Sequence, residues 1–275
     1  YPLRRQRQMC IRDRPIAARL RAPVPAGVAS DYLRAYTQPG DLVLIPYCQG
    51  PDVVRDVVAE GRRAVALNFD PLMVLLTRAW LSPPPRRELD AAVARLGDSL
   101  KQDIPLRRYL ERLYATTCPA CLRPAVADEF TWDRESAVPV AKHVRCAACS
   151  WDARSAADAE DRTRLDQIQP RGMHYHFVLD RVAPPGTDAR LRARLEKLLT
   201  LYSPRNLYAL AELTMKVEAL FDAGALRDAL KVLLLDCLDR CAALPQPGDD
   251  NGQALRPSLR RLAARPRFVE RNVWR

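Results

Sequence analysis

The chain has 275 residues, of which 48% are hydrophobic, so it is long enough to bury a sizeable core in one large or two smaller domains. No apolar run approaches the roughly 18 residues of a membrane-spanning helix, and no secretory signal stands at the start, so we expect a cytoplasmic protein without a membrane partner. The formal net charge of +11 and the pI of about 9.5 are typical of a protein with a polyanionic partner, and equally of a bacterial genome rich in G and C.

The first 14 residues differ from the rest of the chain. They read YPLRRQRQMCIRDR, have no hydrophobic period, and resemble translated adaptor sequence at the edge of an assembled fragment. We therefore expect residues 1–14 to be a non-native scar that takes no part in the fold. They contain five arginines and one aspartate, so they account for part of the basic excess.

Four alternating elements follow a turn signal at residues 38–41. The apolar spacing predicts a strand over Asp41–Pro46 and a helix over Pro51–Glu60. A second buried strand is predicted over Arg63–Asn68. A second helix is predicted over Pro71–Leu81, and Asp70 caps it. In the first helix the apolar face is formed by Val53, Val54, Val57 and Val58. Strand, helix, strand and helix at this spacing predict a βαβα unit with a parallel sheet.

Two more amphipathic helices are predicted after the breaker SPPPRR, over Glu88–Asp103 and Pro105–Tyr114. We assign residues 15–113 to a partial Rossmann-like domain. The whole chain is then an α/β protein with a small cysteine-rich ribbon at residues 114–155 and a mainly helical segment at residues 156–275.

Two C-x-x-C pairs, 24 residues apart, are the strongest chemical signal: Cys118, Cys121, Cys146 and Cys149. Each pair brings two thiolates to one ion, and two pairs complete a tetrahedral site, so we expect structural Zn²⁺ with no open position. Disulfides are unusual in a cytosolic chain. His143 is a less favoured fifth candidate ligand.

The segment between the pairs also holds aromatic and basic residues. We expect Phe130 and Trp132 to pack the small ribbon, although aromatics next to basic groups can stack on bases. Solvation and phosphate contact both stay open for the basic residues Arg134, Lys142, His143 and Arg145.

The last segment begins with a short helix within residues 156–168, and residues 172–180 read as a strand or as the entry to a helix. Residues 188–244 are almost wholly helical, with breaks at 203–206 and 222–224 and a loop at 245–253. Ser203 caps one helix, and a phosphate contact by Arg205 stays open. We expect surface or packing roles for His174 and His176, and buried thiols at Cys237 and Cys241. The final RFVERNVWR reads as the start of another element, so we expect truncation at the C-terminus.

The turn after the first strand resembles the AdoMet motif D-P-F-x-G-x-G-T of DNA methyltransferases that modify exocyclic amino groups. Pro46 and Tyr47 match it, whereas Ile45 stands at the leading Asp. GRRAVALNFDPL resembles the continuation G-R-x-x-x-G-x-D-x-x-P, with Asn68 where an acidic residue normally holds the cofactor ribose. The resemblance extends to bacterial DNA-methylase-like proteins with an inserted zinc ribbon, and covers roughly residues 25–275.

This resemblance implies AdoMet binding and a DNA partner. The implied cofactor residues are Pro46, Tyr47, Cys48, Gly50, Asn68 and Asp70. The catalytic tetrapeptide [D/N/S]-P-P-aromatic does not occur in the sequence, and SPPP at 82–85 reads as a helix terminator, so no catalytic residue is assigned. Two alternatives remain: a non-catalytic zinc-ribbon nucleic-acid-binding protein on a degenerate methyltransferase scaffold, and a zinc-stabilised protein-interaction module.

Overall fold

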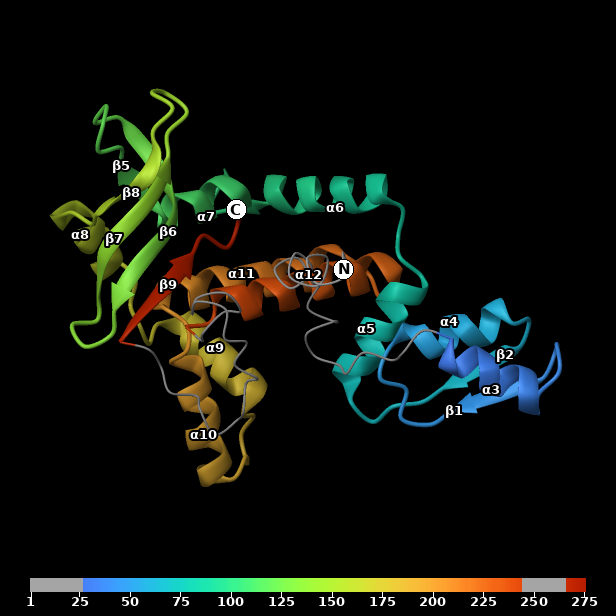
Figure 1. The fold of residues 1–275 in the computed structure, drawn as a ribbon. Coiled ribbons are helices and arrows are strands. Elements are labelled where there is room, and N and C mark those ends of the chain that lie inside the picture. The colour runs from blue at the N-terminus through green and yellow to red at the C-terminus, as the bar shows by residue number, and fades with distance from the viewer. Residues whose placement is uncertain (1–26, 244–265) are drawn as a thin grey trace, which may run out of the picture. The chain divides into compact units, whose positions relative to one another are not determined.

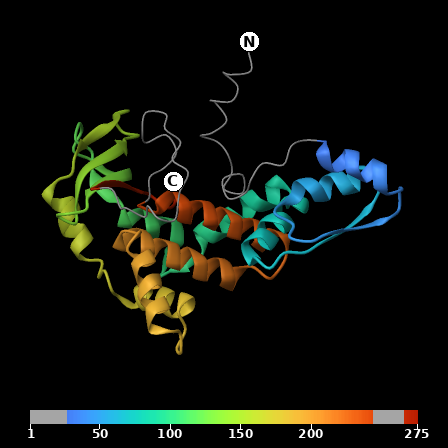
Figure 2. The ribbon, with the colours of Figure 1, turned by 60° about the horizontal axis from the view of Figure 1, so that its bottom comes forward.

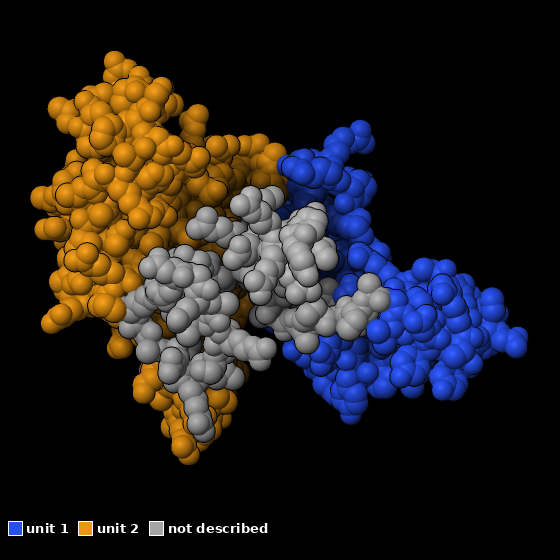
Figure 3. All heavy atoms as spheres, viewed as in Figure 1, with its two compact units in different colours: residues 1–92, 218–236 blue, residues 93–217, 237–275 orange. Residues whose placement is uncertain are grey.

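A computed structural model describes residues 27–243 and 266–275 as a mixed α/β protein. It divides into two compact units, coloured separately in Figure 3. Unit 1 contains residues 27–92 and 218–236, and unit 2 contains residues 93–217, 237–243 and 266–275. The units group the chain differently from the ranges 15–113, 114–155 and 156–275, which stay predictions. The expected scar at 1–14 and the expected loop at 245–253 lie outside the described residues.

Unit 1 is built around two parallel strands. Its elements are α3 (Val28–Tyr36), β1 (Leu42–Ile45), α4 (Pro51–Ala59), β2 (Arg63–Ala66), α5 (Pro71–Leu81) and the start of α6 (Arg86–Asp98). The register of the strands runs from Leu42 opposite Arg63 to Ile45 opposite Ala66. Because no tight turn can join parallel strands, the chain crosses from β1 to β2 through α4. The predicted order and the parallel pairing are both confirmed.

The helices α3 and α4 lie together on one side of this sheet (Figures 1 and 2). Helix α4 buries Val54 and Val57 against it, whereas Val58 remains exposed. The opposite face of the sheet is apolar but open, with 40–61% of each side chain exposed at Leu42, Leu44, Val65 and Leu67. The prediction of a buried second strand was therefore wrong for the described residues, because the helices cover one face only.

A second apolar cluster of unit 1 forms around Leu76 of α5. Partly buried side chains of α5 and of α12 (Ala225–Cys241) pack against Leu76, among them Trp80 and Val232. Arg78 forms an ion pair with Asp228 at 3.0 Å. This cluster holds α5, and with it the turn that precedes α5, in a defined place within unit 1.

Unit 2 contains a five-stranded antiparallel sheet in the order β5-β6-β7-β8, with β9 paired to β6. The strands are β5 (Ala115–Thr117), β6 (Pro124–Asp133), β7 (Val138–Arg145), β8 (Asp152–Ala156) and β9 (Arg267–Arg271). A small hairpin, β3 (Leu100–Lys101) with β4 (Ile104–Pro105), precedes them. The helices are α7 (Leu106–Leu113), α8 (Ala159–Asp166), α9 (Met173–Val182), α10 (Ala189–Leu199) and α11 (Pro204–Leu220). Among the described helices, none is long and apolar enough to cross a membrane.

Three local predictions are settled by these elements. The helix expected over residues 88–103 ends at Asp98, because Gln102 and Asp103 adopt left-handed φ angles of 49° and 62° in the turn of the β3–β4 hairpin. Residues 173–182 form a helix and not a strand. The segment around Arg267, expected as the start of another element, is a strand that completes the sheet.

A buried ion pair fixes β9 to the rest of unit 2. Arg205 at the start of α11 is 1% exposed, Glu270 of β9 is 0% exposed, and their Nη2 and Oε2 atoms lie 3.0 Å apart. Glu270 also accepts hydrogen bonds from Trp132 Nε1 at 2.6 Å and from the Ser203 hydroxyl. Ser203 caps α11 as predicted, accepting from the Asn206 N–H at 3.1 Å. The phosphate role left open for Arg205 is excluded by this burial.

Candidate metal centre and cofactor turn

The four cysteines occupy two turns of matching geometry, one after β5 and one after β7. In each turn the first cysteine donates its backbone N–H to the residue five positions later: Cys118 to the carbonyl of Arg123 at 2.9 Å, and Cys146 to that of Trp151 at 2.8 Å. The residue after the second cysteine is left-handed in both turns, with φ of 58° at Leu122 and 57° at Ser150. The two C-x-x-C pairs therefore form equivalent knuckles.

The two knuckles bring all four Sγ atoms within 4.8 Å of one another, with 3.7 Å between Cys118 and Cys149 and 3.7 Å between Cys121 and Cys146. A tetrahedral ion with Zn–S bonds of roughly 2.3 Å places its sulfurs roughly 3.8 Å apart. A disulfide would instead need about 2.05 Å. The cluster could therefore hold a metal ion such as zinc, and the prediction that these four residues come together is confirmed.

The thiols of this cluster cannot all ionise easily without a cation. The backbone N–H of Cys121, with that of Ala120, lowers the pKa of Cys118 to about 6. The Trp151 backbone N–H acts to lower the pKa of Cys149, but burial and the neighbouring sulfurs outweigh it and raise that pKa to about 12. A divalent ion would remove this repulsion, because thiolates are the form that binds metal.

The aromatic residues of the ribbon are buried, as predicted. Phe130 is fully buried, and Trp132 packs its ring against Phe268 with the centroids 5.8 Å apart. They form the core of the sheet and leave no ring free for a base.

The basic residues of the ribbon lie next to carboxylates. Lys142 is buried and forms ion pairs with Asp161 at 2.8 Å and Asp158 at 2.6 Å. His143 Nε2 lies 2.9 Å from Asp152, outside the cysteine cluster, so the structure gives no support for it as a metal ligand. The partly exposed Arg145 contacts Asp128 at 2.7 Å, and Arg134 stacks over the ring of Phe268. Lys142, His143 and Arg145 therefore each lie beside a carboxylate, whereas Arg134 contacts a ring.

The expected cofactor residues meet where β1 and β2 end. The Cys48 N–H donates to Leu67 O at 2.8 Å, and Asn68 Nδ2 donates to Cys48 O at 2.7 Å. These two bonds hold the turn after β1 against the turn after β2. Tyr47 and Phe69 are exposed, with their ring centroids 5.9 Å apart. Pro46 and Gly50 flank the same turn.

The polar side chains of these turns already have partners within them. Asn68 Oδ1 accepts from the Asp70 N–H at 2.8 Å, and Asp70 Oδ1 accepts from the Leu72 N–H at 2.8 Å as the cap of α5. Both polar atoms of Asn68 therefore serve the turn. Asp70 keeps its second carboxylate oxygen for another contact.

A further site was missed in the sequence. Unit 2 contains a cavity of about 730 Å³ that we call the α7–α11 cavity, because Tyr109 of α7 and Tyr208 of α11 both line it. His174, expected at the surface or in packing, is buried in its wall and meets the ring of Tyr208 edge-on. The lining residues come from segments up to 106 positions apart, between Gln102 and Tyr208, so no local pattern reveals them.

Comparison of the chain with protein-family models, with curated proteins and with solved structures finds no match.

Proposed function

We propose that this chain is the AdoMet-binding and DNA-contacting part of a DNA methyltransferase-like protein that methylates an exocyclic amino group of a base. The observation that carries the proposal is the pair of hydrogen-bonded turns at the carboxyl ends of β1 and β2. In open α/β sheets, ligands bind outside the carboxyl ends of parallel strands. On this proposal unit 1 is a Rossmann-like half-site in a cytoplasmic protein, and the cysteine cluster holds structural zinc.

The backbone of the first turn supports this proposal. Tyr47 adopts a left-handed φ of 59°, and Gly50 adopts a φ of 154° that side chains rarely tolerate. The left-handed conformation of Tyr47 costs about 1–3 kcal/mol, and strain of this kind clusters at ligand sites. Gly50 has no Cβ and adopts its angle without that cost. The strain is held in place by the bonds from Cys48 and Asn68 described above.

The exposed aromatic pair supports the choice of an adenine-containing ligand. Phe69 is 89% exposed and Tyr47 is 68% exposed, beside the strained turn. Two exposed rings at the strand ends offer flat apolar faces to a purine, whose stacking on an aromatic ring is worth roughly 1–3 kcal/mol. The net charge falls from +11 to 11 − 4 = +7 when residues 1–14 are left out, and this remaining basic excess supports DNA as the partner.

Calorimetric titration of zinc-loaded protein with AdoMet tests the proposal. We expect saturable binding that Phe69→Ser weakens about fivefold or more, because the variant removes one stacking face. Tyr36→Ser is the matched control, since Tyr36 is 80% exposed in the same unit but contacts Tyr32 instead of the turns. Asn68→Ala should weaken binding further by releasing the two turns.

The AdoMet proposal fails if correctly folded protein shows no heat of binding with AdoMet. It also fails if Phe69→Ser and Tyr36→Ser lose affinity for AdoMet equally. Circular dichroism and zinc content establish folding before each titration. These measurements separate a site without affinity from an unfolded variant.

A second candidate function is a non-catalytic zinc-ribbon nucleic-acid-binding protein. It is favoured by Asn68, a neutral residue where an acidic one normally holds the cofactor ribose, whose Nδ2 and Oδ1 each already make one bond within the turns. On this reading the protein binds DNA with a steep salt dependence and does not bind AdoMet. DNA titrations at two salt concentrations, beside the AdoMet titration, distinguish the two functions.

A further inference from the structure

The α7–α11 cavity has a cationic and polar lining. Arg112 of α7 and Arg164 of α8 line it, together with three glutamines from the β3–β4 turn and the α8–α9 segment, and none of the described lining residues is acidic. Two carboxylates of the helices that line it are paired: Glu160 with Arg164 Nη2 at 2.5 Å, and Glu212 with Lys101 at 2.7 Å. The lining therefore favours a ligand with negative charge.

Two buried nitrogen atoms of the lining have no hydrogen-bond partner among the described residues. His174 is 9% exposed and its Nε2 is unpartnered, and Nη1 of Arg164 is buried and unpartnered as well. A buried donor without a partner costs about 1–3 kcal/mol, and more when it is charged. Because a guanidinium only donates, the group that completes Arg164 must be an acceptor such as a phosphate oxygen.

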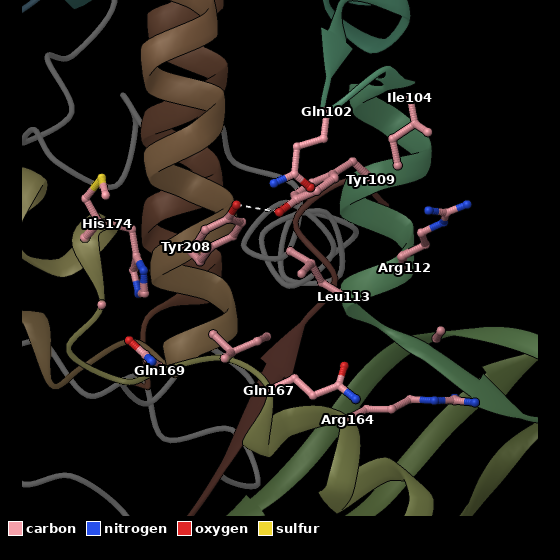
Figure 4. Close-up of a pocket in the computed structure, with 14 residues that line it drawn as sticks. Gln102, Ile104, Tyr109, Arg112, Leu113, Arg164, Gln167, Gln169, His174 and Tyr208 are labelled. Carbon is pink, nitrogen blue, oxygen red and sulfur yellow. Dashed lines mark hydrogen bonds between the residues drawn. The ribbon is translucent and has the colours of Figure 1, made fainter.

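The aromatic side chains lie between these two nitrogen atoms. In Figure 4, His174 lies on one side of Tyr208, and Arg112 and Arg164 lie on the other. The hydroxyls of Tyr109 and Tyr208 are 2.6 Å apart, and the ring centroids of His174 and Tyr208 are 5.1 Å apart. Burial, together with the bond from Tyr109, raises the pKa of Tyr208, so its phenol remains protonated.

The glutamines add side-chain amides that can form hydrogen bonds with the edge of a nucleobase. Gln167 and Gln169 lie along one edge of the cavity and Gln102 lies above Tyr109 (Figure 4). An amide offers one acceptor and two donors, the combination that pairs with the edge of a nucleobase. A volume of about 730 Å³ is ample for one nucleotide.

We propose that the α7–α11 cavity binds one nucleoside phosphate, with the base among the tyrosines, His174 and the glutamines and the phosphate at Arg164. The nucleotide comes either from solution or from a single strand, since both present the same base and phosphate. The site does not rest on the cofactor turns, and its test uses a pyrimidine nucleotide that has no adenine.

Calorimetry of the full zinc-loaded chain with thymidine 5′-monophosphate tests the proposal. We expect saturable binding that Arg164→Gln weakens about tenfold, because a charge-assisted hydrogen bond is lost. Arg162→Gln is the matched control: it removes the same charge from the same helix at an exposed position outside the lining, and should change affinity less than about twofold.

A second variant keeps the test independent of the arginine. Met173 lines the cavity and is 89% exposed, so Met173→Trp should add bulk at the solvent-facing part of the lining with little effect on folding, and should reduce binding. Met173→Ala is its control and should keep the affinity.

The source of the nucleotide is read from competition with fluorescein-labelled octathymidylate. Displacement of the octamer by the mononucleotide supports a unit of a strand, and mononucleotide binding without octamer binding supports a free nucleotide. No binding of either at millimolar concentration overturns the proposal. Equal loss of nucleotide affinity in Arg162→Gln and Arg164→Gln also overturns it. If inorganic phosphate binds as tightly as the nucleotide, the assignment of a base is overturned.

Discussion

The buried Arg205–Glu270 pair should contribute more to the stability of unit 2 than any exposed ion pair. Glu270 accepts from Arg205 Nε at 3.2 Å and Nη2 at 3.0 Å, and neither side chain reaches solvent. Arg205→Met or Glu270→Gln leaves one buried charge without its counter-ion, which costs about 3–5 kcal/mol. The double variant removes both charges, and the amide oxygen that Glu270→Gln introduces would still accept a hydrogen bond from Trp132. The double variant should therefore recover much of the stability that each single variant loses.

Urea unfolding of zinc-loaded protein, followed by tryptophan fluorescence, measures this cycle because Trp132 belongs to the network. We expect a coupling free energy of about 2 kcal/mol or more. Arg107→Met with Glu111→Gln is the matched control, an exposed pair of α7 at 3.1 Å that should be worth less than about 0.5 kcal/mol. Single variants of Arg205 and Glu270 that cost no more than the control would refute the reasoning.

Two further outcomes are expected for the ribbon. Wild-type protein should carry one zinc ion. Cys121→Ser should lose the ion and Cys237→Ser should keep it, because Cys121 belongs to the Sγ cluster and Cys237 does not. Elemental analysis measures the zinc content, and zinc-free wild-type protein would contradict the prediction. Burial acts to lower the pKa of Lys142, but hydrogen bonds and charges from Asp158 and Asp161 outweigh it and raise that pKa. The stabilisation from Lys142 is therefore present below its unfolded pKa of about 10.4 and is lost as pH rises through the pKa of the folded protein. The difference in unfolding free energy between wild type and Lys142→Met should accordingly shrink above about pH 10.4. A gap that stays constant to about pH 12 would count against the pairing.

Local patterns located the elements that depend on local chemistry. The cysteine spacing found the metal cluster because two knuckles need nothing beyond their own loops. Caps such as Asp70 and Ser203 marked where α5 and α11 begin, since each bonds within three residues. The parallel pairing of β1 and β2 followed from the length of the connection between them.

Features that depend on distant residues escaped the sequence. The sequence placed Arg205 at a helix start with a phosphate contact left open, and gave no sign of its pairing with Glu270, 65 positions later. For Lys142 the sequence left solvation and phosphate contact open, whereas the structure pairs it with two carboxylates at the start of α8. The apolar strand at Val65 predicted burial, because periodicity reports which face is apolar and not whether another layer covers that face.

The pairing of β9 with β6 also affects the order in which the chain can fold during synthesis. Trp132 stands opposite Phe268 in that ladder, so the edge of β6 finds its partner only after more than a hundred further residues have been made. At roughly 5–20 residues per second this takes on the order of 10 s. Throughout that interval the nascent ribbon presents an unpaired strand edge beside an aromatic side chain, the kind of surface that other chains join. Slow translation would therefore prolong the exposure of this edge and favour aggregation of the unfinished chain.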